Sequence, residues 1–310
     1  MEELKALEVI KQIRVLPEAE YIFKHVLTQV VIYESLLLKR RKELHGLVGQ
    51  AIEEFYKDRL EEQYEALAHH FSISNYFDKA IQYLELAGDK ATKYFSLGEA
   101  RRHFRVAIDL LDSKKKTSED KILYINLSLK WAEVSHYVAS EDHIEILKLS
   151  LKYAQDLKNE AQIAKTTYWI ARMEYSLGNM LESLPYYEKC IEMADELEGG
   201  EMRALPYNFI GRICLFTSEW LKAVNYLEKG IPMLKRLGNQ DEIAYSTGML
   251  GLIYGFMGNF EKGFSLINEA LHIAREIGNK TREAVSLMYM CGVNLYQGVW
   301  KESLKYGSQA

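Results

Sequence analysis

The sequence predicts an all-α protein in which helix-turn-helix hairpins stack into a right-handed superhelical solenoid, preceded by a short segment of another kind. The first observation is a residue pattern that recurs every 40 positions through the second half of the chain. The second is that 310 residues include only four prolines, because proline inside a helix costs about 3 kcal/mol or more. The third is an apolar content of 48%, which is sufficient for a buried core.

Composition excludes several other classes. A charged fraction of 27% with this apolar content is not typical of a disordered chain. No run of 18 apolar residues is present, so no transmembrane helix is predicted, and the N-terminus lacks the layout of a signal peptide. Three cysteines are too few for a disulfide framework. The net charge of −5 gives no general attraction to nucleic acid or anionic lipid. We therefore expect a cytoplasmic protein that does not bind a membrane.

Four columns of the repeat carry the periodic signal. The register is set by a turn whose residues are Gly178, Ser218, Gly258 and Gly298. Shortly after this turn, each period has a large apolar residue at Met180, Trp220, Phe260 and Trp300. A small residue follows at Ser183, Ala223, Gly263 and Ser303. Before the turn, another small residue occupies Ala171, Gly211, Gly251 and Cys291.

Each period has a simple mechanical interpretation as two helices, A and B, of roughly 14 to 17 residues each. A glycine or asparagine after a helix can adopt the left-handed conformation that ends it, which predicts caps at Gly178 after helix A and at Asn239 after helix B. The second turn recurs at Asn159, Gly199, Asn239 and Asn279. Small residues let the two helices cross closely, and stacking of hairpins buries the remaining apolar stripe. Pro232 lies inside a predicted helix B, where we expect a kink or an early end.

These columns resemble the tetratricopeptide repeat (TPR) family. The family's alternation of small and large residues is present at Gly251, Tyr254, Gly258, Phe260, Gly263 and Ala270, and in the preceding period at Gly211, Trp220 and Ala223. The period of 40 exceeds the family's usual 34, so the chain resembles a subgroup with longer helices. The resemblance covers residues 161–310, and residues 121–160 form a degenerate first repeat with Trp131 in place of the small residue and Val138 in place of the turn glycine.

The sequence therefore predicts four regions. Residues 1–60 form a winged-helix remnant and a connecting helix. Residues 61–112 form a block of shorter-spaced TPR-like helices, with half of the repeat signature at Phe77, Ala80, Leu84 and Ala87 and again at Ala100, Phe104 and Ala107. Residues 113–120 (SKKKTSED) form a polar linker. Residues 121–310 form the array with the 40-residue period, whose last repeat is truncated.

Residues 1–60 do not follow the repeat. Val9–Arg14 and Tyr21–Phe23 are predicted strands around a turn at residues 16–20, and a helix is predicted from Val26 through the basic run Lys39–Lys42. The segment YIFKHVLTQVVIYESLLLKRRKELH, residues 21–45, resembles the junction that follows the nucleotide-binding module of bacterial AAA/STAND-type signalling ATPases. The matching residues are Tyr21, Phe23, His25, Leu27, Tyr33, Ser35, Leu36, Arg41, Leu44 and His45.

This second resemblance implies a winged-helix element that leads into TPR repeats, within a larger protein often fused to an adenylate or guanylate cyclase, a kinase or a transcriptional output domain. The chain contains no GxxxxGK[ST] phosphate loop, so ATP binding is not implied for it. The chain then resembles the C-terminal sensor region of such a protein, and the parent protein is the ATPase, cyclase or kinase.

No constellation of catalytic residues is visible, and we expect neither an enzyme nor a cofactor. There is no HExxH, no Cys-x-x-Cys and no nucleophile elbow. His69 and His70 are adjacent and therefore point about 100° apart on a helix, which disfavours joint metal binding. Cys190, Cys214 and Cys291 lie at helix-packing positions and are expected to be buried and inert. The basic run Lys39–Lys42 is balanced by acidic residues, so nucleic-acid binding is not favoured.

The concave face of the solenoid is the candidate binding site, formed by helix A residues that packing does not use. The expected groove residues are Lys165, Tyr168, Arg172, Tyr175, Asn208, Arg212, Phe216, Tyr245, Met249, Tyr289 and Tyr296. Asparagine can pair both hydrogen-bonding groups of a peptide unit, and arginine can bind a carboxylate through two parallel bonds. Aromatic side chains add contact area at a small entropic cost. The alternative for the aromatic residues is that they pack between adjacent A helices.

The predicted function is a non-catalytic protein–protein interaction scaffold, which binds a peptide or protein segment of some acidic character in this groove. That segment is either part of another protein or intramolecular. Two rival hypotheses are a DNA-binding transcription regulator, in which residues 1–60 complete a winged helix, and a self-contained enzyme with unrecognised chemistry. A homo-oligomer is also predicted, because the last hairpin, which ends at residues 306–310, has no polar capping helix to cover its apolar edge.

Overall fold

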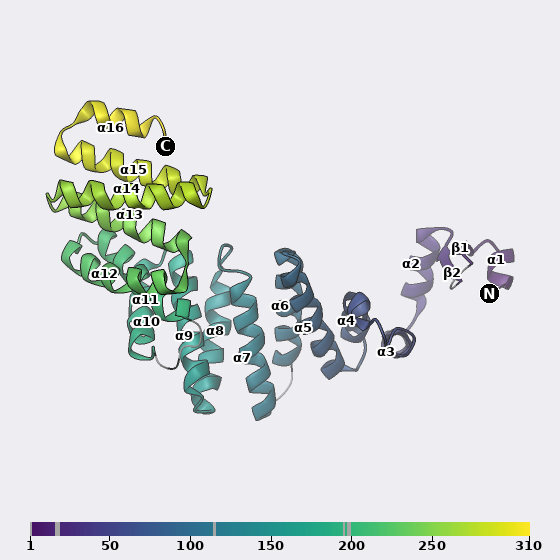
Figure 1. The fold of residues 1–310 in the computed structure, drawn as a ribbon. Helices are drawn as coiled ribbons and strands as arrows, with labels where there is room; N and C mark the ends of the chain where they lie inside the picture. Colours follow the sequence, from purple (N-terminus) through teal and green to yellow (C-terminus); the bar gives the residue numbers. More distant parts are fainter. Residues whose placement is uncertain (1, 16–18, 114–115, 195, 197–199) are drawn as a thin grey trace. The chain divides into compact units, whose positions relative to one another are not determined.

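The computed structural model describes all residues except 1, 16–18, 114–115, 195 and 197–199. It is helical from the first described residues to the last, apart from one two-stranded sheet. The chain divides into two compact units, unit 1 at Met1–Lys115 and unit 2 at Lys116–Ala310 (Figure 1). The all-α prediction is confirmed.

Unit 1 begins with a helix and a β-hairpin. Helix α1 (Glu2–Ala6) precedes strands β1 (Ile10–Arg14) and β2 (Glu20–Phe23), which pair antiparallel with Ile10 opposite Phe23. The two predicted strands are therefore present, whereas most of the predicted turn, residues 16–18, lies outside the described residues.

The prediction of one continuous helix from Val26 through Lys42 is wrong. The structure has two helices in this segment. Helix α2 (Val26–Ser35) ends before Leu36, whose ψ of 136° is extended, and α3 (Leu38–Phe55) follows. Arg41 of α3 reaches back and donates to the carbonyl oxygens of Leu36 and Glu34, at 3.0 and 2.8 Å. These bonds satisfy carbonyl groups that the interruption leaves without helical partners.

The remainder of unit 1 is a run of packed helices. A single 3₁₀ turn (η1, Leu60–Gln63) leads into α4 (Tyr64–Ile73), α5 (Phe77–Lys93) and α6 (Leu97–Asp112). The residues that carried half of the repeat signature are almost all buried here, with Ala80, Ala87, Ala100 and Ala107 at 0% exposure and Phe104 at 1%. Phe104 occupies the space beside Gly88, where a Cβ atom would clash with its ring, so α5 and α6 pack closely.

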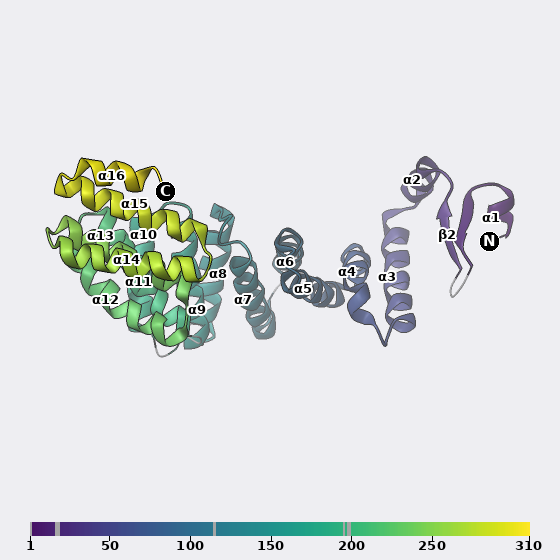
Figure 2. The same ribbon diagram turned by 45° about the horizontal axis from the view of Figure 1, so that its top comes forward.

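In its described residues, unit 2 has five helix pairs that follow one another along the chain (Figures 1 and 2). The A helices are α7 (Ser118–Glu133), α9 (Glu160–Ser176), α11 (Gly200–Phe216), α13 (Gln240–Phe256) and α15 (Lys280–Gln297). The B helices are α8 (Glu141–Asp156), α10 (Met180–Glu192), α12 (Trp220–Leu237), α14 (Phe260–Glu276) and α16 (Trp300–Gly307). Thr117 and Asp120 form a capping box that begins α7, so the last residues of the predicted linker are helical.

The left-handed turns confirm the register after helix A and correct it after helix B. Gly178, Gly258 and Gly298 have φ angles of 89°, 84° and 83°, and Ser218 has 60°. After helix B, the left-handed residue is one position earlier than predicted, at Gly238 with φ 69°, and Asn239 instead begins α13. The reason is that the Asn239 side chain accepts a hydrogen bond from the N–H of Glu242, which caps the next helix. Gly199 lies outside the described residues.

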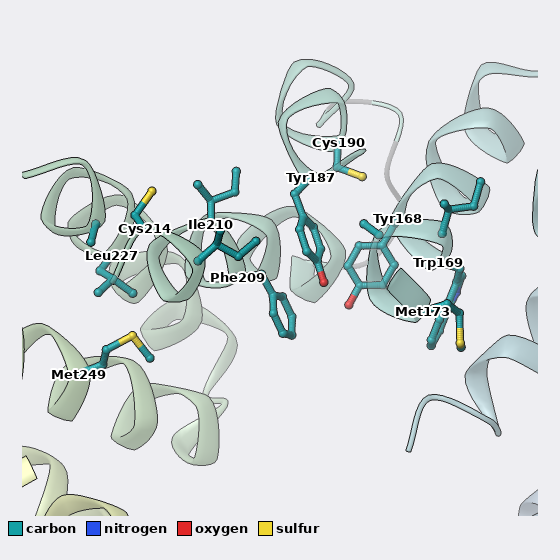
Figure 3. Packing of buried hydrophobic residues seen from close by; sticks show 14 of the residues in the cluster. Tyr168, Trp169, Met173, Tyr187, Cys190, Phe209, Ile210, Cys214, Leu227 and Met249 are labelled. Atoms are coloured by element: carbon teal, nitrogen blue, oxygen red, sulfur yellow. The ribbon is translucent and has the colours of Figure 1, made fainter. Parts of the chain in front are cut away.

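The small-residue columns lie where helices A and B cross. A Cβ atom on Gly251 of α13 would approach the Gly263 carbonyl oxygen to 2.7 Å and Ile267 Cγ1 to 2.8 Å. The main core cluster of unit 2 is apolar and aromatic (Figure 3), and in it the rings of Tyr187 of α10 and Phe209 of α11 stack at 5.1 Å with an interplanar angle of 2°. These apolar side chains are buried because successive hairpins stack on one another, as the period predicted.

Two further expectations concern the B helices. Helix α12 continues through Pro232 to Leu237, so the predicted early end at Pro232 is wrong.

The last hairpin exposes four large apolar side chains. They are Met288 at 61%, Tyr296 at 57%, Trp300 at 66% and Leu304 at 76% exposure. These side chains form the apolar surface on which the expected self-association depends, and self-association stays a prediction.

The crossing at Gly251 yields a stability prediction. Gly251→Ala places a methyl group against backbone atoms of α14, and we expect the free energy of unfolding of unit 2 to fall by about 1–3 kcal/mol, as in other overpacked cores. The matched control is Gly98→Ala, because the nearest atom to its added Cβ is 3.9 Å away in the first turn of α6. This control should be neutral or slightly stabilising. Urea unfolding followed by circular dichroism measures both variants, and equal midpoints for both would contradict the close crossing.

Candidate functional site

The predicted groove residues divide into buried and accessible side chains. Four of them are buried in the packing between helices: Tyr168 at 4%, Asn208 at 0%, Arg212 at 7% and Met249 at 1% exposure. Lys165, Arg172, Tyr175, Tyr245 and Tyr289 are half-buried, and Phe216 and Tyr296 are exposed at 65% and 57%. The buried four have little surface to offer a partner, because the A helices pack against neighbouring helices over part of the face that the repeat register assigned to the groove.

Asn208 was assigned to the groove from the repeat register, but the structure places its side chain elsewhere. Its Oδ1 lies against Gly230 of α12, where a Cβ atom on the glycine would clash with it. Asn208 therefore faces helix B of its own hairpin rather than the outer surface of the A helices. Neither of its amide atoms has a hydrogen-bond partner in the part of the chain that the structure describes.

A column of stacked cations and rings runs across the four A helices α9, α11, α13 and α15. The guanidinium carbon of Arg172 lies 4.4 Å from the ring centroid of Phe209, and that of Arg212 lies 4.6 Å from the same centroid. Arg212 is also 4.2 Å from the centroid of Tyr245, which Arg282 approaches to 4.4 Å. The order is thus Arg172–Phe209–Arg212–Tyr245–Arg282, which we call the arginine column.

Each cation–π contact of this kind contributes about 0.5–2 kcal/mol, and the larger values belong to desolvated pairs. Since Arg212 is almost fully buried between two rings, the column holds helices α9, α11 and α13 together as well as presenting charge.

Acidic side chains neutralise two of the three arginines. Arg212 forms an ion pair with Glu242. Arg282 binds Asp241 through two bonds, from Nε at 2.9 Å and from Nη2 at 2.7 Å, and Glu242 lies 3.9 Å from Arg282. The bidentate Arg282 guanidinium lowers the pKa of the Asp241 carboxyl, and the Asn279 side chain adds a hydrogen bond at 2.7 Å.

Arg172 is different because it has no acidic partner among the described residues. It is half-buried and is surrounded by aromatic side chains, with the Tyr175 ring 4.8 Å from the ring of Phe209 on which Arg172 stacks. Burial raises the pKa of the nearby Tyr175 and Tyr187 hydroxyls, so these groups do not supply a negative charge. Arg172 therefore retains an unneutralised charge at one end of the arginine column.

The remaining predicted residues are partly connected to the column. The Tyr289 ring lies 6.4 Å from that of Tyr245, and Tyr296 lies 5.4 Å from Phe256 rather than from the arginines. The column and its ion pairs also include Phe209, Asp241, Glu242 and Arg282, which were not among the predicted groove residues. A usable signal existed, because Glu242 and Arg282 occupy the same phase of successive repeats and so face each other across α13 and α15.

Two of the three cysteines are buried as predicted, Cys190 and Cys214, and burial raises the pKa of the Cys190 thiol to about 12, so it is not a thiolate at neutral pH. The prediction is wrong for Cys291, which is only half-buried. In the basic run, Arg40 pairs with Glu43 at 3.1 Å and Arg41 with Glu34 at 3.0 Å. Two of its four cations are thus already neutralised within unit 1.

Comparisons with known proteins agree with the repeat architecture. Residues 162–236 match the family model described as tetratricopeptide repeat. No curated protein matches the chain. No helix in the described part of the chain combines the length and the apolar character needed to cross a bilayer.

Several solved structures have a similar fold. A Rap protein complexed with Competence and Sporulation Factor aligns with a TM-score of 0.55 at 16% identity, covering 92% of this chain and 84% of that one. Aspartyl phosphate phosphatase F from Bacillus subtilis has a TM-score of 0.56 at 12% identity, covering 91% of this chain and 69% of that one.

A Signal Transduction ATPase with Numerous Domains (STAND) protein with a tetratricopeptide repeat sensor, from Pyrococcus horikoshii, has a TM-score of 0.51 at 17% identity. The alignment covers 99% of this chain and 44% of that one. At these identities the likeness establishes a TPR-like helical solenoid and no more.

The Asp241–Arg282 pair yields a pH-dependent prediction. The folded pKa of Asp241 is lowered, so its contribution to stability is complete above its unfolded pKa of about 3.9 and is lost as the pH falls through the folded value. Asp241→Asn should cost about 1 kcal/mol or less at pH 7, because the carboxylate is partly exposed. The difference from the parent chain should shrink between pH 6 and pH 3.

Glu269→Gln is the matched control, because it removes the same charge from a pair with Lys235 that is exposed on both sides. Urea unfolding across this pH range measures both variants. A loss for Asp241→Asn that stays constant from pH 6 to pH 3 would contradict an electrostatic origin.

Proposed function

We propose that this chain is a non-catalytic protein–protein interaction scaffold. In this proposal, the A-helix face of unit 2 binds a peptide or protein segment of acidic character. The observation that carries the proposal is Arg172, a half-buried cation that lies over an aromatic ring and has no acidic partner among the described residues. A guanidinium in this state favours a carboxylate ligand, because two parallel N–H donors match the two oxygens.

The surroundings of Arg172 support a peptide ligand rather than a free anion. The Arg172 guanidinium lies over the Phe209 ring, and the Tyr175 ring lies beside Phe209. Rigid aromatic walls next to a charged donor suit a side chain that brings both a carboxylate and apolar contact area. Of the predicted groove residues, we assign direct contact to Arg172, Tyr175 and Tyr245, which remain partly accessible. Arg212 is a positioning residue, because it is buried within the arginine column.

The comparisons support the same class of function. A Rap protein with a similar fold has been solved with Competence and Sporulation Factor bound, and a STAND protein with a similar fold carries its repeats as a sensor. We extend the proposal to a sensor or regulatory role of this chain within a larger bacterial signalling protein, for which the segment at residues 21–45 is the sequence support. The DNA-binding alternative is weaker, because Arg40 and Arg41 are neutralised by Glu43 and Glu34.

A peptide selection tests the role of Arg172. A random peptide library displayed on phage is selected on the immobilised full-length chain, and the affinity of an enriched peptide is measured by fluorescence anisotropy. We expect enriched peptides to share an Asp or Glu. Arg172→Gln should weaken binding about 10-fold or more, because a charge-assisted hydrogen bond contributes about 1.5–3 kcal/mol.

The control variant is Arg236→Gln, which makes the same substitution at an exposed position on helix α12. Its affinity for the selected peptide should equal that of the parent chain. Circular dichroism spectra of both variants verify that they are folded. If the enriched peptides lack acidic residues, or if both variants bind equally well, the assignment of Arg172 is wrong.

A further inference from the structure

Unit 1 contains a cavity of about 500 Å³ that is lined by residues of α2, α3 and α4. Its walls are largely apolar, and the side chains that form them are those of Tyr33, Leu36, Leu44, Val48 and Ile73. A space of this size lies within the range of about 300–1,000 Å³ that is typical of small-molecule sites. Neither the repeat architecture nor the arginine column of unit 2 accounts for this cavity.

One cation lines this cavity with part of its hydrogen-bonding capacity unused. Arg41 donates from Nε to the carbonyl oxygen of Leu36 at 3.0 Å, and from Nη2 to the carbonyl oxygen and Oε2 of Glu34 at 2.8 and 3.0 Å. Its guanidinium carbon lies 4.7 Å from the ring centroid of Tyr33. Arg41 Nη1 has no partner among the described residues. The cation is therefore held by its other two nitrogen atoms, while the two N–H donors of Nη1 stay available.

A chain of hydrogen bonds in the same lining leaves a second polar group unpaired. Tyr33 Oη lies 3.1 Å from His45 Nε2, and His45 Nδ1 lies 3.0 Å from His70 Nδ1. A neutral imidazole has one N–H and one lone pair, so when Tyr33 donates to His45, His45 donates to His70 and the hydrogen of His70 is on Nε2. In the described part of the chain, His70 Nε2 has no hydrogen-bond partner. Burial lowers the pKa of His70 to about 4, so this ring is uncharged at neutral pH.

We propose that this cavity binds a small organic acid, in which one carboxylate is attached to a short apolar chain or ring. The carboxylate accepts hydrogen bonds from Arg41 Nη1, and the apolar part lies against the aliphatic walls. Hydrogen bonds between a guanidinium and a carboxylate are roughly twice as strong as those between neutral groups. His70 Nε2 is the second donor that the cavity offers to the ligand. The site lies in unit 1, so it is separate from the Arg172 surface of unit 2 and does not rest on the function proposed above.

The charges around the cavity favour an anion over other ligands. Among the described residues that line it there is no Asp or Glu, and Arg41 carries the only permanent charge. Glu34 lies beside Arg41, but its side chain is 62% exposed and it accepts from Nη2 rather than from Nη1. Water screens such a pair, so Glu34 offsets only part of the attraction for a second carboxylate. An uncharged ligand would cover Nη1 without pairing it, which costs free energy, and an amine would be repelled by Arg41.

The test measures the binding of octanoate, and of octanol as its uncharged match, to the full-length chain by isothermal titration calorimetry at neutral pH. One equivalent of octanoate should bind about 10-fold or more tightly than octanol, as expected for a hydrogen bond to a charged group. Arg41→Gln should remove most of this preference and retain the affinity for octanol, which verifies that the cavity is intact in the variant. Val48→Trp places a large side chain in the cavity lining and should weaken the binding of both ligands.

Two control variants should bind octanoate as tightly as the parent chain. Leu47→Trp makes the same change as Val48→Trp at a neighbouring exposed position that does not line the cavity, and Arg172→Gln removes the unneutralised cation of unit 2. Circular dichroism verifies that each variant is folded. Absence of a one-equivalent octanoate site, equal affinities for octanoate and octanol, or equal octanoate affinities in Val48→Trp and Leu47→Trp would overturn the proposal. A loss of octanoate binding in Arg172→Gln rather than in Arg41→Gln would place the acid in unit 2 and would overturn it as well.

Discussion

The close crossing of the two helices within a hairpin is the constraint on which the rest of unit 2 depends. At the α13–α14 crossing, Gly251 lies so near Gly263 that a Cβ atom on either residue would approach the other's carbonyl oxygen to within 3 Å. Such a crossing fixes the angle and separation of each hairpin. Hairpins built in this way then stack along the chain, and neighbouring A helices come into contact. Side chains on the facing sides of successive A helices can therefore meet.

The arginine column is a consequence of that stacking. Phe209 and Tyr245 come from successive A helices, and the gap between their rings accommodates one guanidinium, that of Arg212. A charge buried to this extent is stable only when it is paired, and Glu242 provides the pair from the next repeat. The same helices that create the column therefore also neutralise its interior. The charge of Arg172 on α9 is not neutralised in this way. Its guanidinium lies over the Phe209 ring, but it has no carboxylate partner among the described residues.

The features that the sequence predicted well are those set within one hairpin. The left-handed turns at Gly178 and Gly258 and the buried small residues at Ala171 and Ala223 follow from local geometry that glycine and alanine make possible. Contacts between repeats were less predictable. The periodic register could not show that Asn208 faces Gly230, nor that Arg212 lies between two rings, because both depend on how neighbouring helices approach.

The break between α2 and α3 was not predicted from the sequence, because it also depends on a contact between separate helices. The segment from Tyr33 to Leu38 contains no glycine or proline, so neither of these residues ends the helix there. The end is stabilised instead by Arg41, which returns from the following helix to the carbonyl oxygens of Glu34 and Leu36. This clamp orients the end of α2, and Tyr33 is thereby brought to His45. Arg41 therefore acts across a helix boundary, in the part of the chain that does not follow the repeat.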